Sequence, residues 1–388
     1  MPKTIAITPS WYWPENVDRV AGIPPYGVDE LCLTRHARDR PDAPAIICNG
    51  GKTSFSELEG WVNGVATHLM ELTEGAGRAV FRGASDTESL VVLLASLRAG
   101  IHLRMALPDE SLSELSSVFG TQVCIGAEDA QADRVAAPAG QRRTADLEAP
   151  VIAMCGAHGT VNHSHRSLLA GMISLSAFLG ATPEGAWLPA LPLGRWEGVI
   201  STLMGLYTGV GVVLGSNGSA EGFAELISRE RPQYVYGDLQ EVTRATREAR
   251  RAVKAARDTL TAMLVATSGP FDPGDRQRVG KSFRCPALTT YTLAETGLIF
   301  AAHPRWYLDE SVGIPVTNAH VVPADPRNGS PISTLWEMVE SAEVTVKGPM
   351  LMCGFEGQEA TDRYCDGRYR TGVIASSDAN GMIYVLPD

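Results

Sequence analysis

A cysteine and a histidine lie three residues apart in the segment MCGAHGT, and together they could do chemistry. Cys155 and His158 form the pairing that acyl-transfer reactions use, because an imidazole can deprotonate a thiol and the thiolate is the nucleophile. The alternative is structural, with Cys155 as a small buried residue and His158 as a space-filling side chain. The nearby His163 and His165 have a spacing that does not by itself indicate a zinc site.

Two charged residues are further candidates. Glu295 follows the apolar run YTLA, and an acid at a strand end of an α/β fold commonly faces the ligand crevice. It could bind Mg²⁺ or act as a base, or it could simply be held in a hydrogen bond. Arg195 stands among Pro, Leu and Trp196, so it needs an anionic partner if enclosed. That partner could be a phosphate, a substrate carboxylate, or an internal acid such as Glu197.

Short apolar runs that alternate with helical patterns predict an α/β fold to position these residues. Ser54–Leu72 and Thr87–Ala99 are expected to be helices; Ser54 or Ser56 can cap the first, and Gly100 ends the second. Strands are expected at Ala79–Arg82, Val151–Met154, Val210–Leu214, Tyr234–Tyr236 and Ala262–Ala266. After about Gly313 the helical periods vanish, and the turn signals Asp366-Gly367 and Asn380-Gly381 predict strands at Val344–Val346, Tyr364–Tyr369 and Met382–Leu386.

Composition and charge exclude several classes of protein. The 388 residues carry a net charge of −11, so there is no basic excess to bind nucleic acid. No apolar stretch of about 20 residues is present, so no membrane span is expected. Met1–Trp13 lacks the pattern of a secretory signal, and the seven cysteines are scattered without a CxxC pair. These features predict reduced thiols and a cytoplasmic location.

An ordered set of motifs resembles the adenylate-forming superfamily, which includes acyl-CoA synthetases, adenylation domains of nonribosomal peptide synthetases, and luciferases. The set covers nearly the whole chain. It comprises RPDAPAIICNGGKTSFSELEGWVNGVATHL (Arg40–Leu69), LPLGRWEGVISTLMGLYTGVGVVL (Leu191–Leu214), YTLAET (Tyr291–Thr296), SVGIP (Ser311–Pro315), VKGPMLMCGF (Val346–Phe355), DGRYRTG (Asp366–Gly372) and DANGMIYV (Asp378–Val385).

The resemblance implies a fold and a set of sites. The expected fold is the large N-terminal domain of the superfamily, with two packed α/β subdomains over residues 1–312 and a distorted β-barrel over residues 313–388. The mobile C-terminal domain is expected to be absent, since the chain ends at Asp388. ATP and Mg²⁺ are the implied cofactors. Tyr291 would stack on adenine, Glu295 would bind the metal, and Gly156, Gly159 and Ser268 would lie at the nucleotide.

The chain departs from the family pattern at several nucleotide contacts. The phosphate loop, MCGAHGTVNHSHRSLL, is about three residues shorter than usual and lacks its Pro and Lys, although Gly156 and Gly159 remain. Arg195 occupies a position where the family often has a histidine. Val373 replaces the acid that would bind the ribose hydroxyls. The departures predict that ATP use is weakened or lost.

Three hypotheses follow. In the first, the protein is a divergent acyl-CoA synthetase-like enzyme that acts on an acyl thioester or carboxylate by acyl transfer, cyclisation or hydrolysis, without a required cofactor. Glu295, His158, Cys155 and Arg195 would then lie near the chemistry. In the second, it is a genuine adenylating ligase whose C-terminal domain is supplied in trans or truncated. In the third, it is a non-catalytic scaffold that docks an acyl or peptidyl carrier protein. The family habit suggests secondary metabolism.

Overall fold

The computed structural model describes residues 13–73, 77–131, 146–180, 185–215, 219–305, 307–333, 336–357 and 363–387. The helices are α1 (Arg35–Asp39), α2 (Phe55–Leu72), α3 (Thr87–Ala99), α4 (Leu112–Phe119), α5 (His165–Leu179), α6 (Trp196–Thr208), α7 (Ala220–Glu230), α8 (Leu239–Glu248), α9 (Arg250–Ala255) and α10 (Pro273–Phe283). A π-helical turn, Glu30–Thr34, precedes α1, and a 3₁₀ turn covers Ala127–Gln131.

The strands form three sheets. The first contains β1 (Pro44–Cys48), β2 (Gly51–Ser54), β8 (Ala186–Ala190), β9 (Gly211–Leu214), β10 (Tyr234–Asp238), β11 (Ala262–Thr267), β12 (Ala287–Leu293), β13 (Gly297–Ala301) and β14 (Ile314–Pro315). The second contains β3 (Arg78–Phe81), β4 (His102–Met105), β5 (Cys124–Ile125), β6 (Pro150–Gly156), β7 (Gly159–Ser164) and β17 (Gly354–Phe355). The third contains β15 (His320–Ala324), β16 (Ala342–Lys347), β18 (Tyr364–Cys365), β19 (Arg368–Ser377) and β20 (Ile383–Val385).

The nine-stranded sheet has a parallel centre with antiparallel edges. Its order is β14-β13-β12-β11-β10-β8-β9-β1-β2, and the strands from β12 to β1 run parallel. The six-stranded sheet has the order β17-β7-β6-β4-β3-β5. Since parallel strands need helical crossovers, both sheets are flanked by helices, as the alternating sequence pattern predicts.

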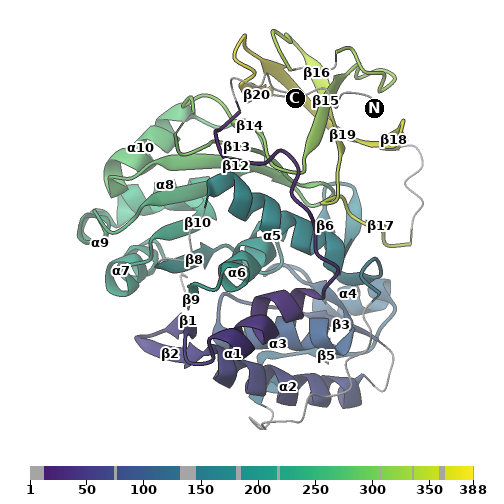
Figure 1. Ribbon diagram of the computed structural model, residues 1–388, viewed down its shortest axis with the longest axis vertical. Coiled ribbons are helices and arrows are strands. Elements are labelled where there is room, and N and C mark those ends of the chain that lie inside the picture. The colour runs from purple at the N-terminus through teal and green to yellow at the C-terminus, as the bar shows by residue number, and fades with distance from the viewer. Residues whose placement is uncertain are drawn as a thin grey trace.

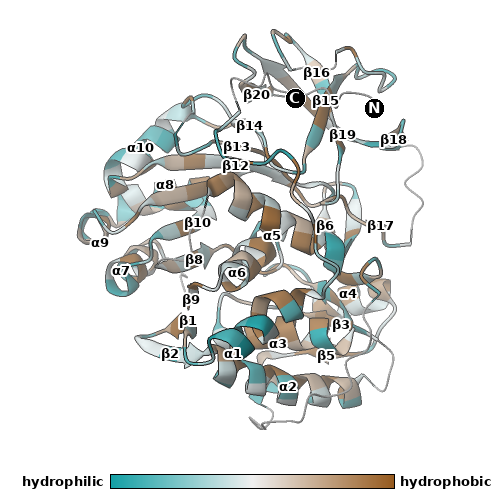
Figure 2. Ribbon diagram, viewed as in Figure 1, coloured by the Kyte–Doolittle hydropathy of each residue, from teal (hydrophilic) through white to brown (hydrophobic). Residues whose placement is uncertain are grey.

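Helices α5 and α6 lie between the two mixed sheets, and α7 to α10 cover the outer face of the nine-stranded sheet (Figure 1). Figure 2 shows α5 as a mainly apolar helix, which fits a position buried on several sides. One large core joins the two mixed sheets through α2, α3, α5 and α6, and a second core lies beneath α7 to α10. The predicted α/β fold class is therefore confirmed.

The third sheet is antiparallel and forms half a barrel at one end of the molecule (Figure 1). Its β18–β19 hairpin turns at Asp366 and Gly367, which have φ of 50° and 70° as a two-residue hairpin requires. Two short strands of the segment 313–388 pair elsewhere, β14 with β13 and β17 with β7. The segment thus shares backbone hydrogen bonds with both other sheets, and its separation as a domain stays a prediction.

No helix in the described ranges is both long and apolar enough to cross a membrane.

Candidate functional site

The carboxyl ends of parallel strands from both mixed sheets meet at one place, and the candidate residues follow those ends. Arg195 lies beyond β8, Ser268 directly after β11, and Glu295 after β12. The two sheets touch here: Ser85 donates a hydrogen bond to the Leu191 carbonyl at 3.2 Å. Ligands of α/β folds bind at such an edge.

The shortened phosphate loop is a tight β-hairpin. β6 and β7 pair antiparallel from Pro150 to Ser164, and Gly156 faces Gly159 as the last pair before the turn. Only Ala157 and His158 form the turn, so the segment makes no wide loop. Beside it, β17 pairs with β7 and the Glu356 amide donates to the Thr160 carbonyl at 2.8 Å. The hairpin is therefore held on both sides.

Glu295 lies against the turn of this hairpin. The His158 amide donates to Glu295 Oε1 at 3.2 Å, and the side chain is buried with 1% exposed. Its other oxygen, Oε2, is also buried and accepts no hydrogen bond from the described part of the chain. Because a buried carboxylate oxygen without a donor is unfavourable, this atom is suited to bind a cation or to take a proton.

The packing of Glu295 depends on a missing side chain at Gly156. A Cβ at Gly156 would meet Glu295 Oε1 and Val161 Cγ1 at 2.8 Å and the Gly159 carbonyl oxygen at 3.0 Å. We expect Gly156→Ala to lower the free energy of unfolding by about 1–3 kcal/mol, measured by urea denaturation, because overpacking forces the hairpin apart. Gly269→Ala is the matched control, since its Cβ would have no atom within 4 Å. An equal effect in both variants would contradict the packing argument.

Arg195 is engaged by internal acids. Its guanidinium donates to Asp238 at 3.1 Å and to Glu197 at 3.3 Å, and Glu197 also accepts from the Thr292 hydroxyl. Burial alone would lower the pKa of Arg195, but the carboxylates outweigh it and the pKa is raised. The internal salt bridge to Glu197 is confirmed, and Asp238 completes it. A substrate anion at Arg195 would have to compete with both acids.

The Cys155 thiol and the His158 imidazole contact other groups and not each other. Cys155 Sγ contacts the Gly156 carbonyl at 3.7 Å, whereas the His158 ring contacts the Arg363 guanidinium at 3.1 and 3.3 Å. Cys155 is exposed, so the interpretation as a buried residue is wrong. Even so, partial burial of the thiol and the nearby Glu110 raise the pKa of Cys155. The thiolate is therefore disfavoured at neutral pH.

The two residues expected at the nucleotide base differ in exposure. Tyr291 is 1% exposed and lies against Phe300 with ring centroids 6.1 Å apart, so its face is not open to solvent. Ser268 is exposed and follows Thr267, the residue that pairs with Tyr291 across the sheet. Their roles in nucleotide binding stay predictions. His163 and His165 are buried and bonded to backbone, the first to the Ala294 carbonyl.

Magnesium and triphosphate fit this site unequally. Glu295 Oε2 suits Mg²⁺, which proteins often bind through one carboxylate together with substrate phosphates. Within the described residues no three His, Cys, Asp or Glu side chains gather to hold a metal. The hairpin is a poor fit for phosphate, since the His158 amide already donates to Glu295 and the turn carries no lysine. The half-buried Val373 offers no acceptor to a ribose.

Sequence reasoning missed two residues of this region. Asp238 is the last residue of β10 and caps α8, and an acid at a strand end was a usable signal for it. Arg363 had no such signal, because it lies 205 residues from His158 and only the packing of the third sheet brings them together.

Comparisons with known proteins agree with this architecture. The sequence profile described as AMP-binding enzyme matches residues 159–355, just over half of the chain. The 2-succinylbenzoate–CoA ligase of Bacillus licheniformis is 29% identical over 219 residues, which are 55% of this chain and 43% of that ligase. The corresponding ligase of Bacillus subtilis is 25% identical over a match of the same length, with the same coverage. The chain thus spans less than half the length of these relatives.

Solved structures show the same fold. Apo MatB from Rhodopseudomonas palustris has a TM-score of 0.80 at 18% identity, covering 93% of this chain and 78% of that chain. Unliganded o-succinylbenzoate coenzyme A synthetase (MenE) from Bacillus subtilis has a TM-score of 0.79 at 19% identity, covering 92% and 78%. On these findings the chain belongs to the AMP-binding enzyme family, with the fold of the adenylate-forming acyl-CoA ligases.

Proposed function

We propose that this protein acts on an acyl carboxylate or acyl thioester and that its use of MgATP is weakened or lost. The observation that carries the proposal is the hydrogen bond from the His158 amide to Glu295, which ties the former phosphate loop to the residue expected to bind the metal. Each lost hydrogen bond to a charged phosphate or to the ribose acid lowers binding by roughly 1.5–3 kcal/mol. Three or four such losses reduce ATP affinity by a factor of about a thousand or more.

Acyl transfer from a thioester does not require a nucleotide, because the acyl group is already activated. Glu295 would take the proton of an attacking water or alcohol as the new C–O bond forms. The C–S bond then breaks, and the leaving thiolate takes the proton back. The thiol would be that of coenzyme A, as in the names of the relatives, or that of a carrier protein. A cytoplasmic location and a role in secondary metabolism belong to the same proposal.

The test is calorimetry with MgATP together with an assay of ATP–pyrophosphate exchange. We expect the protein to bind MgATP with a Kd above roughly 1 mM and to catalyse no exchange. Mass spectrometry with a panel of acyl thioesters should then detect release of the free thiol. Binding tighter than millimolar, or exchange, would instead support an adenylating ligase assisted in trans. Absence of both activities, with capture of a purified carrier protein, would support a scaffold.

Val373→Asp separates the two parts of the nucleotide site. The new acid can accept the ribose hydroxyls, so we expect adenosine affinity to rise by about tenfold or more. MgATP should gain no more than adenosine, because the Gly156–Gly159 hairpin still lacks phosphate ligands. Calorimetry with both ligands measures the two gains, and Val373→Asn is the neutral control. A gain for MgATP that clearly exceeds the gain for adenosine would show that the hairpin does bind phosphate.

A further inference from the structure

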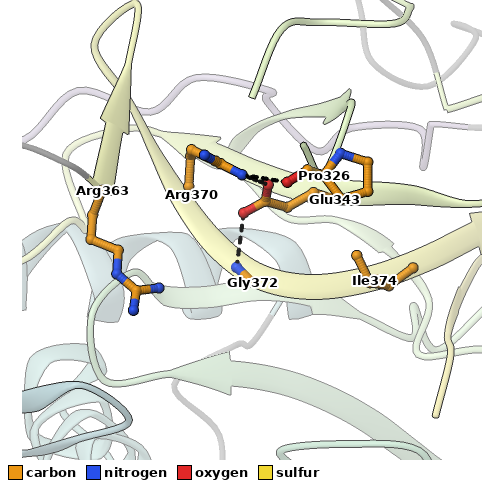
Figure 3. Close-up of a pocket in the computed structure, with 6 residues that line it drawn as sticks. All are labelled: Pro326, Glu343, Arg363, Arg370, Gly372 and Ile374. Carbon is orange, nitrogen blue, oxygen red and sulfur yellow. Dashed lines mark hydrogen bonds and ion pairs between the residues drawn. The ribbon is translucent and has the colours of Figure 1, made fainter. Parts of the chain in front are cut away.

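A cavity lies on the third sheet, near the turn of the β6–β7 hairpin. Its volume is about 320 Å³, at the lower end for small-molecule sites. It is lined by Pro326, Glu343, Arg363, Arg370, Gly372 and Ile374 (Figure 3). Two guanidinium groups and one carboxylate therefore share a small space in a chain whose overall charge is −11.

Both oxygens of the carboxylate in this pocket accept hydrogen bonds. Glu343 is 3% exposed; its Oε2 accepts from Arg370 Nε at 3.0 Å and Nη2 at 2.7 Å, and its Oε1 accepts from the Gly372 amide at 3.0 Å. Arg370 also donates to the Pro326 carbonyl at 2.7 Å. Glu343 and Arg370 thus neutralise each other, and the pair forms part of the lining of the pocket.

Arg363 stands apart from that pair. Figure 3 shows its guanidinium pointing away from the group formed by Arg370, Glu343 and Pro326. It contacts the His158 ring, at 3.1 Å from Nε2 and 3.3 Å from Nδ1, and forms no ion pair with any acid in the described segments. Among the described residues that line the pocket, this half-buried side chain thus carries a positive charge with no acid paired to it.

We propose that this pocket binds an oxyanionic group, a phosphate or a carboxylate, with Arg363 as its main binding residue. A guanidinium presents a planar fork of N–H donors that matches either group in a bidentate manner. Ile374 and the Pro326 ring supply an apolar wall for a short chain next to the charged group. The site lies next to the edge at Glu295, since Arg363 contacts the His158 ring and the His158 amide donates to Glu295. The proposal holds whether or not that edge acts on acyl groups.

The test titrates the full chain with inorganic pyrophosphate and, separately, with succinate, in low-salt buffer without nucleotide. We expect one of the two probes to bind, and its affinity to fall at least tenfold in Arg363→Gln. Arg363→Lys should give an intermediate loss, because it keeps the charge without the fork. The exposed Arg327→Gln next to the pocket removes the same charge and should stay within twofold of wild type.

The two probes distinguish the sources of the anion. Preference for pyrophosphate would assign a phosphate-bearing ligand, and preference for succinate would assign a carboxylate. Binding of both probes weaker than roughly 10 mM, or equal binding by Arg363→Gln and wild type, would overturn the proposal. Equal melting temperatures of the variants exclude unfolding as the cause of a loss. None of these outcomes depends on MgATP, so the proposed function is tested separately.

Discussion

Replacing Arg98 by methionine is expected to lower the free energy of unfolding by about 3–5 kcal/mol. Arg98 links its own helix, α3, to α2 and to the start of the π-helical turn. It donates to Asp29 at 3.0 Å, to Glu59 at 2.9 Å and to Asn63 at 2.6 Å. The side chains of Arg98 and Asp29 are only 8% exposed. The variant leaves both carboxylates with no cation, and a buried charge without a partner is far less stable than a buried pair.

Urea denaturation measures this loss, and Arg38→Met is the matched control. Arg38 pairs with Asp39 at 2.7 Å, but the two side chains are 75% and 53% exposed. Because water screens an exposed pair, the control should change stability far less than Arg98→Met does. Similar losses in the two variants would contradict a role for burial. A much smaller loss for Arg98→Met would mean that Asp29 and Glu59 find other donors.

Burial of His163 is expected to make the protein acid-sensitive. The pKa of this imidazole is lowered to about 4 by burial, against the ordinary 6.5, although its bond to the Ala294 carbonyl acts in the opposite direction. A carbonyl can only accept, so Nε2 carries the proton and Nδ1 accepts from Ser167. The neutral ring thus stabilises the fold fully above pH 6.5, and this contribution is lost as the pH falls towards 4.

His163→Asn should remove this dependence. Between pH 7 and pH 4.5 the wild type should lose about 2–3 kcal/mol more stability than the variant, measured by urea denaturation at each pH. His102, on β4 of the same six-stranded sheet, provides a second test, because burial and the nearby Arg78 also lower its pKa to about 4. His102→Asn should flatten the curve by a similar amount. If stability fell with pH equally in the wild type and both variants, the acid sensitivity could not come from these two buried histidines.

Elements with strong local signals were predictable from the sequence. Ser54 accepts from the Glu57 amide and caps α2, and α3 ends before Gly100, whose φ is 69°. The turn at Asp366-Gly367 likewise lies where the dipeptide indicates it. In each case neighbouring residues satisfy the backbone, so a short stretch of sequence contains the whole interaction. The order of strands in the sheets has no such local signal, and only the structure shows it.

The candidate site was predictable only in part. Strand-end residues such as Glu295 were identifiable, because a parallel sheet brings its carboxyl ends to one edge. Their partners were not. The sequence left open whether Glu295 faces a metal, a proton or a hydrogen bond, and the contact with the His158 amide answers part of that question. Cys155 and His158 are close along the chain, yet the strand geometry gives their side chains different neighbours.

By itself the sequence determined the α/β class and the family, since these depend on residue types and on their order. Only the tertiary structure decided the partners of charged groups. In the structure Arg195 pairs with Glu197 and Asp238. The turn of the β6–β7 hairpin bonds to Glu295, and Arg363 contacts the His158 ring beside a pocket on the third sheet. The physical reason is range: capping and turn formation act over a few residues, whereas ion pairing needs groups brought together by the packing of separate sheets.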